Sequence, residues 1–126
     1  MAPMESVYDL YRRGCELLEH GDHQAAIVPL SRARNREPDK ASIREALGRA
    51  LFHAQRYESA AAEFEAIASS APTNDYALFC LGRSMQLLGR HREACQPLAL
   101  ACSLAPERED YRRYRDRARR AAAGGD

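Results

Sequence analysis

Histidine and cysteine are the residues of this chain best suited to metal binding or nucleophilic chemistry, and there are four of each. Cys15, His20 and His23 lie within one short stretch that resembles part of a zinc site. Protein zinc sites usually have four ligands, however, and no fourth ligand is evident beside these three. His53 has no nucleophile or paired carboxylate at catalytic spacing. These residues therefore indicate a protein that is not an enzyme and that needs no cofactor or metal.

The four cysteines contain no CxxC pair. Cys95 and Cys102 are seven residues apart on one expected helix, which separates them by about 10 Å, too far for a disulfide. We expect reduced thiols, with Cys95 and Cys102 packing as small hydrophobic residues.

Three arginines, Arg49, Arg83 and Arg117, recur at an interval of 34 residues, each close in sequence to an aromatic residue. A guanidinium group can donate paired hydrogen bonds to a carboxylate and can stack on an aromatic ring. On a repeated helical unit these side chains would form a ladder, with successive arginines about 8 to 10 Å or somewhat more apart. The pattern predicts a surface that binds acidic groups, provided that such a unit exists.

The composition predicts helices. The 126 residues are dominated by Ala, Leu, Arg and Glu, contain no Trp and have few β-branched residues between the glycines and prolines. This indicates a single all-α domain, residues 1–126.

Lys40 is the only lysine among 19 basic residues, a usage that suggests a bacterial genome of high GC content.

The charge argues against several classes of partner. Nineteen basic and 18 acidic residues leave a net charge of +1, too small to attract nucleic acid or an anionic membrane. The Arg-rich segment 108–120 also contains acidic residues, which argues against nucleic acid binding there. No apolar stretch has the length of a signal peptide or a membrane span, so we expect a cytoplasmic protein with no membrane partner.

The chain repeats itself every 34 residues. Shifting the sequence by 34 aligns four sets of residues: Gly14, Gly48 and Gly82; Ala26, Ala60 and Ala94; Leu30, Phe64 and Leu98; Pro38, Pro72 and Pro106. A fixed period of this length is typical of stacked repeat proteins.

With these positions the chain resembles the tetratricopeptide repeat (TPR) family, whose 34-residue unit forms two antiparallel helices, A and B. The resemblance implies a right-handed α-solenoid of seven helices: repeats at 7–40, 41–74 and 75–108, a capping helix at about 109–121 and a disordered tail at 122–126. One departure is the usual Trp of position 4, which is replaced by Leu10, Arg44 and Leu78.

Positions 3 and 10 of each helix A would face the preceding repeat. In the first unit they hold Asp9 and Glu16, for which we expect contact with water. In the later units we expect burial of Ile43 with Ala50, Ala77 with Ser84, and Tyr111 with Ala118.

Pro29 and Pro97 both fall at position 23 of their 34-residue units, inside a helix B rather than in a loop. Proline removes a backbone hydrogen bond and crowds the preceding turn, so we predict a bend in the first and third B helices only.

In the TPR family the concave groove lined by the A helices usually binds an extended peptide or a partner helix. The resemblance therefore implies a protein-interaction module, and the aromatic and basic lining predicts an acidic ligand with apolar anchors. The expected groove residues are Tyr8, Tyr11, Cys15, Glu45, Arg49, Phe52, His53, Tyr76, Phe79, Cys80, Arg83, Arg113 and Arg117.

Two alternatives stay open. Arg49 can instead pair with Glu45, and Arg83 can lean on Phe79, which would make the groove an ordinary solvated face. The chain can also be a structural subunit of a stable homo- or hetero-oligomeric complex.

The carboxylate clamp that grips Hsp70 or Hsp90 tails in this family needs Lys, Asn and Arg at set positions. Those positions here hold Tyr11, Cys15, Ala46, Tyr76 and Cys80, which argues against a chaperone-tail adaptor and leaves the partner unnamed.

Overall fold

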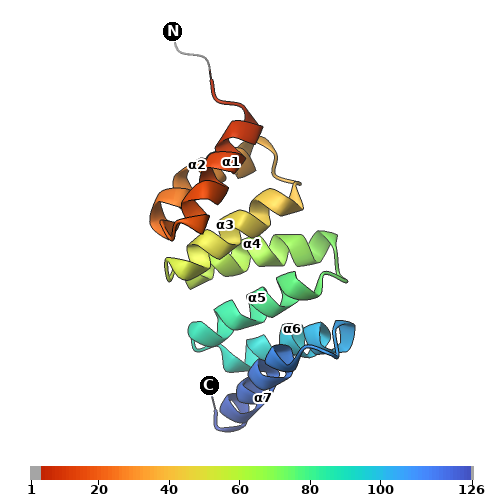
Figure 1. Cartoon of the computed structure of the whole chain (residues 1–126). Coiled ribbons are helices and arrows are strands. Elements are labelled where there is room, and N and C mark those ends of the chain that lie inside the picture. The colour runs from red at the N-terminus through yellow and green to blue at the C-terminus, as the bar shows by residue number, and fades with distance from the viewer. Residues whose placement is uncertain (1–3, 126) are drawn as a thin grey trace. The chain divides into compact units, whose positions relative to one another are not determined.

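The computed structural model describes residues 4–125 and divides into two compact units between Arg56 and Tyr57. Unit 1 contains α1 (Val7–Glu19), α2 (His23–Arg36) and α3 (Ala41–His53). Unit 2 contains α4 (Tyr57–Ser70), α5 (Asp75–Leu87), α6 (His91–Leu104) and α7 (Glu109–Ala123). Within the described residues these seven helices match the predicted number, and the all-α class is confirmed (Figure 1).

The helix boundaries follow from local chemistry. Ser6 and Asn74 cap α1 and α5, because the side-chain oxygen of each accepts a hydrogen bond of 3.0 Å from the backbone N–H three residues later. Helices α2, α4 and α6 each end two residues before a proline of the aligned set Pro38, Pro72 and Pro106. The three aligned prolines therefore lie just beyond the ends of the B helices.

The turns between helices A and B need a left-handed residue. Gly21 and Gly89 supply it in the first and third repeats with φ of 81° and 79°. The second repeat has Gln55 at the matching position, with φ of 64°. A side chain in this region is strained, and glycine is not.

Replacing Gln55 with glycine is expected to raise the free energy of unfolding by about 1 kcal/mol, because it removes that strain. Urea unfolding followed by circular dichroism measures the change. The matched control is Gly89→Gln, which should lower stability by a similar amount. A loss of stability in Gln55→Gly would contradict the strain argument.

Unit 1 buries one stripe from each of its helices. Leu10, Ala33 and Ile43 form a buried cluster, with Val7 and Tyr11 packed at its edge. Helices α1 and α2 approach closely at Gly14, where an added Cβ would collide with the Leu30 side chain. Gly14 and Leu30, which come from two of the aligned sets, are therefore in direct contact.

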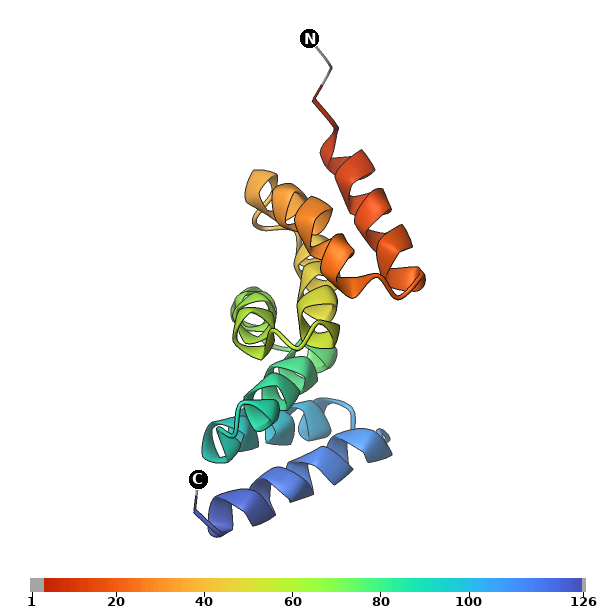
Figure 2. The ribbon, with the colours of Figure 1, turned by 90° about the vertical axis from the view of Figure 1, so that its left-hand side faces the viewer.

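Unit 2 repeats this arrangement and adds the capping helix. Helix α7 packs on α6 and α5, and Figure 2 shows it running beside them at the end of the unit. Its buried residues, Tyr111 and Ala118, belong to two clusters. Tyr111 packs with Leu78, Ala101, Cys102 and Ala105, and Ala118 packs with Ala94 and Leu98.

The predicted change in burial at positions 3 and 10 is confirmed. Asp9 and Glu16 are exposed, whereas the matching residues of later A helices are buried: Ile43, Ala50, Ala77, Ser84, Tyr111 and Ala118. Cys102 is buried and Cys95 half-buried, and all four cysteines are free thiols, as expected.

Pro29 and Pro97 lie inside α2 and α6, as predicted, and both are buried. Glu63, at the same position of α4, is also buried. Burial of the proline ring offsets part of the lost hydrogen bond. The bend that each proline should impose stays a prediction.

The expected end of α7 at residue 121 is wrong by two residues. Ala122 and Ala123 continue the helix, because alanine has the highest helix propensity, and Gly124 caps it. Asp126, the last residue of the predicted tail, lies outside the described residues. None of the helices in the described part of the chain is long and apolar enough to cross a membrane.

Candidate functional site

The predicted groove residues fall on two faces, one in each unit. Helices α1 and α3 carry those of unit 1, and α5 and α7 carry those of unit 2. Arg49 belongs to unit 1, whereas Arg83 and Arg117 belong to unit 2. A continuous ladder of three arginines therefore stays a prediction.

On the unit 2 face, two guanidinium groups share one aromatic ring. The guanidinium carbon of Arg83 lies 3.9 Å from the centre of the Tyr114 ring, and that of Arg117 lies 5.0 Å from it. Both distances are typical of cation–π contacts. Arg83 thus lies over Tyr114 of α7. The alternative interpretation would instead require it to lie on Phe79.

A hydrogen-bond chain holds Arg83 in place. Its Nη1 donates to Oε1 of Gln86 at 2.9 Å, and Nε2 of Gln86 donates to the Tyr114 carbonyl oxygen at 2.8 Å. Burial lowers the pKa of Arg83, and the positive charge of Arg117 lowers it further. Within the described residues no carboxylate lies within ion-pair distance of either arginine. The face therefore presents two positive charges without a counter-charge.

The other predicted residues of this face are largely committed to packing. Phe79 stacks on Tyr111 with ring centres 4.4 Å apart and contacts Tyr114 at 5.7 Å. Tyr76 meets Phe64 edge to face at 6.5 Å. Cys80 is only 9% exposed, whereas Arg113 is exposed. Polar contact with a ligand is thus concentrated on the arginines.

The unit 1 face is centred on Tyr11, which is half-buried. Burial raises the pKa of Tyr11, and so do its hydrogen bond with Cys15 and the nearby charge of Glu45, while Arg49 acts in the opposite direction. Arg49 is exposed and forms no ion pair with Glu45, nor with any other residue that the structure describes. The pairing expected by the alternative interpretation is therefore absent from this structure.

A cavity of about 380 Å³ opens beside Tyr11. Apolar and aromatic side chains form most of its wall, with an exposed Lys40–Glu37 pair, 3.8 Å apart, at its edge. The lining residues are Val7, Tyr8, Tyr11, Glu37, Lys40, Ser42 and Ile43. Its size and lining leave room for at least one apolar side chain.

His53 stacks on His23, with ring centres 4.7 Å apart, and contacts Phe52 edge to face. Burial lowers the pKa of His53, as do the charges of His23 and Arg49. The sequence places His53 on the groove but gives no sign of this stack, because the two histidines are far apart along the chain. Among the described residues no three metal-ligating side chains come together.

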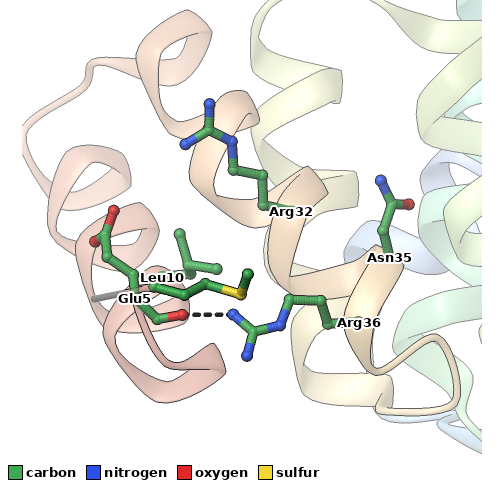
Figure 3. A pocket seen from close by; sticks show the side chains of 6 residues that line it. Glu5, Leu10, Arg32, Asn35 and Arg36 are labelled. Atoms are coloured by element: carbon green, nitrogen blue, oxygen red, sulfur yellow. Dashed lines mark hydrogen bonds between the residues drawn. The ribbon is translucent and has the colours of Figure 1, made fainter. Parts of the chain in front are cut away.

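A further cavity, of about 500 Å³, lies between α2 and the residues that precede α1. Figure 3 shows Arg36 donating a hydrogen bond to the Glu5 carbonyl oxygen, beside Leu10. The Glu5 carboxylate also pairs with Arg13. The repeat pattern contains no signal for this cavity, which belongs to the B-helix side of unit 1.

Known proteins share both the sequence pattern and the fold. The family profile described as "Tetratricopeptide repeat" matches residues 11–75. Superkiller complex protein 3 of Mus musculus is 30% identical over 100 residues, which cover 79% of this chain. The human protein of the same name is 28% identical over the same length. The chain spans only 6% of the length of these relatives.

Solved structures match nearly the whole chain. A structure of MamA has a TM-score of 0.86 at 23% identity and covers 94% of this chain and 68% of its own. The first TPR of Spaghetti (RPAP3), bound to the HSP90 peptide SRMEEVD, has a TM-score of 0.85 at 15% identity and covers 93% of both chains. The Sgt2 TPR domain of Aspergillus fumigatus has a TM-score of 0.82 at 16% identity and covers 97% of this chain and 82% of its own. These structures confirm the fold, and the family profile, which covers more than half of the sequence, shows that this chain belongs to the tetratricopeptide repeat family.

Proposed function

We propose that this chain is a non-enzymatic protein-interaction module that binds a peptide or partner helix through the faces of its A helices. The ligand carries acidic groups and apolar anchors. The observation that carries this proposal is the pair of guanidinium groups on Tyr114, since Arg83 is half-buried and neither arginine has a carboxylate partner among the described residues. An incoming carboxylate would supply the missing charge.

The apolar anchor is assigned to unit 1. The cavity beside Tyr11 and Ile43 has room for at least one side chain, and its wall includes the aromatic residues Tyr8 and Tyr11. Burial of a Leu or Phe side chain there would contribute about 1.5 to 3 kcal/mol to binding.

A structural neighbour supports the choice of an acidic ligand. The peptide SRMEEVD bound to the RPAP3 repeat contains three acidic residues. The positions that the chaperone-tail clamp requires are occupied here by other residue types, including Tyr11, Cys15 and Cys80. We therefore propose that acidic groups meet Arg83 and Arg117 in place of that clamp, and that the partner is not an Hsp70 or Hsp90 tail.

A random peptide-display screen against the full chain tests the proposal. We expect enriched ligands whose binding is weakened at least about tenfold by Tyr11→Ala or by Arg49→Ala combined with Arg83→Ala. Arg119→Ala, which removes one exposed charge from α7, is the matched control and should leave binding within about twofold. Ligands that bind all variants equally would contradict the proposal. A stable oligomer that covers these faces, detected by light scattering, would favour the structural-subunit alternative.

A further inference from the structure

The basic cluster on unit 2 extends beyond the two arginines at Tyr114. Arg113, Arg117 and Arg120 follow one another at spacings of four and three residues, which places them on one side of α7. All three are exposed, and the structure gives none of them an ion pair with a described residue. Arg83 of α5 joins this side through the shared Tyr114 ring.

Three of the other arginines in residues 108–120 differ, because each has a partner. Arg115 pairs with Asp116 at 3.1 Å, and Arg108 pairs with Asp110 at 2.7 Å. Arg112 donates a hydrogen bond to the Pro106 carbonyl oxygen. Two of the acidic residues of α7 are thus committed to arginines outside the cluster, so the cluster keeps its charge.

The two central guanidinium groups are held close together. Both lie over the same ring, so their separation cannot exceed the sum of their distances from its centre, 3.9 and 5.0 Å. Like charges at such a separation repel, and partial burial of Arg83 weakens the screening by water. Stacking on Tyr114 restricts the motion of both groups before any ligand arrives, and the hydrogen bond to Gln86 restricts Arg83 further. A site of this kind is preorganised for an anion with more than one charge.

We propose that Arg83, Arg113, Arg117 and Arg120 form a binding site for an acidic segment of a partner protein in which two or more Asp or Glu side chains are neighbours. The inference rests on the proposed function and assigns the acidic part of the ligand to α5 and α7. A protein segment fits better than a nucleic acid, because the site holds four arginines on a chain whose net charge is only +1, too small to attract a long phosphate backbone.

The test uses an array of labelled dodecapeptides with one leucine, in which Glu–Glu pairs are present, replaced by Gln–Gln, or separated into single Glu residues. Fluorescence anisotropy at two salt concentrations measures Kd for the full chain. We expect the paired Glu peptides to bind at least about tenfold more tightly than the Gln peptides, and more weakly at high salt.

Arg83→Gln and Arg117→Gln are each expected to weaken paired-Glu binding about tenfold, and the double variant to weaken it further. Arg119→Gln removes the same charge from the same helix, two residues from Arg117 and therefore on another side, and should change Kd by less than about twofold. Arg83→Lys keeps the charge but loses the planar stack, and should recover only part of the affinity. Circular dichroism confirms that each variant is folded.

Several results would overturn the site. One is equal loss of binding in Arg119→Gln, and another is an unchanged Kd in the folded double variant. Tighter binding of a phosphoserine peptide or of an RNA oligonucleotide, with the same arginine dependence, would reassign the site to that ligand. If Gln peptides bind as well as Glu peptides and Tyr11→Ala abolishes both, the chain is still a peptide-binding module with an apolar anchor, whereas the acidic part of the ligand and this inference are wrong. If no peptide of the array or the display screen binds, the proposed function itself is wrong.

Discussion

Replacing Tyr111 with alanine is expected to lower the free energy of unfolding by about 3 to 5 kcal/mol, the usual cost of truncating a buried aromatic residue. Tyr111 is fully buried and stacks on Phe79 at 4.4 Å. Its hydroxyl donates a hydrogen bond of 2.8 Å to the Asp75 carboxylate at the start of α5. Burial raises the pKa of Tyr111, and the hydrogen bond to Asp75 raises it further. The ring therefore joins the capping helix to α5 by packing and by a polar contact.

Tyr111→Phe separates the two contributions. It keeps the ring and removes only the hydroxyl, so we expect a loss of about 1 kcal/mol. Urea unfolding followed by circular dichroism and tyrosine fluorescence measures both variants. A change below about 1 kcal/mol in Tyr111→Ala would show that α7 is not part of the cooperative unit. Such a result would also remove the structural basis for placing Arg117 beside Arg83.

The second large effect concerns Gly82 and Leu98, where α5 and α6 approach closely. A Cβ added at Gly82 would lie 2.5 Å from Cγ and 2.7 Å from Cδ2 of Leu98, which is fully buried. Leu98→Ala is expected to cost about 2 to 5 kcal/mol by leaving a cavity. Gly82→Ala is expected to cost about 1 to 3 kcal/mol by overpacking the same space.

In the Leu98→Ala background, Gly82→Ala should raise the free energy of unfolding instead of lowering it. The added methyl group then enters the vacated space, and alanine favours the helix over glycine by about 1 kcal/mol. A double-mutant cycle measured by urea unfolding reports this coupling. Gly124→Ala, at the end of α7, is the control: a Cβ added there would have no side-chain atom within 4 Å, so stability should change by less than about 0.5 kcal/mol. Additive effects of Gly82→Ala and Leu98→Ala would contradict the contact.

Much of the fold could be predicted because the repeat constrains each position in the same way three times. The small residue at Gly14 and Gly82 and the large one at Leu30 and Leu98 occur 16 residues apart in each repeat, and they meet in both units. The burial of Tyr111 and Ala118 followed from their register with Ile43 and Ala50, even though α7 has no B helix of its own.

The candidate site was less predictable, because long side chains choose among rotamers and partners. Arg83 lies over Tyr114 and not on Phe79, since Phe79 is occupied by Tyr111. The Glu45–Arg49 pair of the alternative interpretation does not form, consistent with the small energy of an exposed ion pair. Glycine is missing from the second turn, yet the turn is made, with Gln55 accepting the left-handed conformation.

The amino-acid sequence by itself determined the 34-residue register, the helix type and number, and the residues that each A helix buries, because these depend on periodic patterns and on local backbone preferences. Only the tertiary structure decided which charges stay without a counter-charge. The placement of the Arg83 and Arg117 guanidinium groups depends on contacts between α5 and α7, and the two helices are separated in the chain by α6. Pairing across that separation is set by packing geometry, which no local pattern encodes.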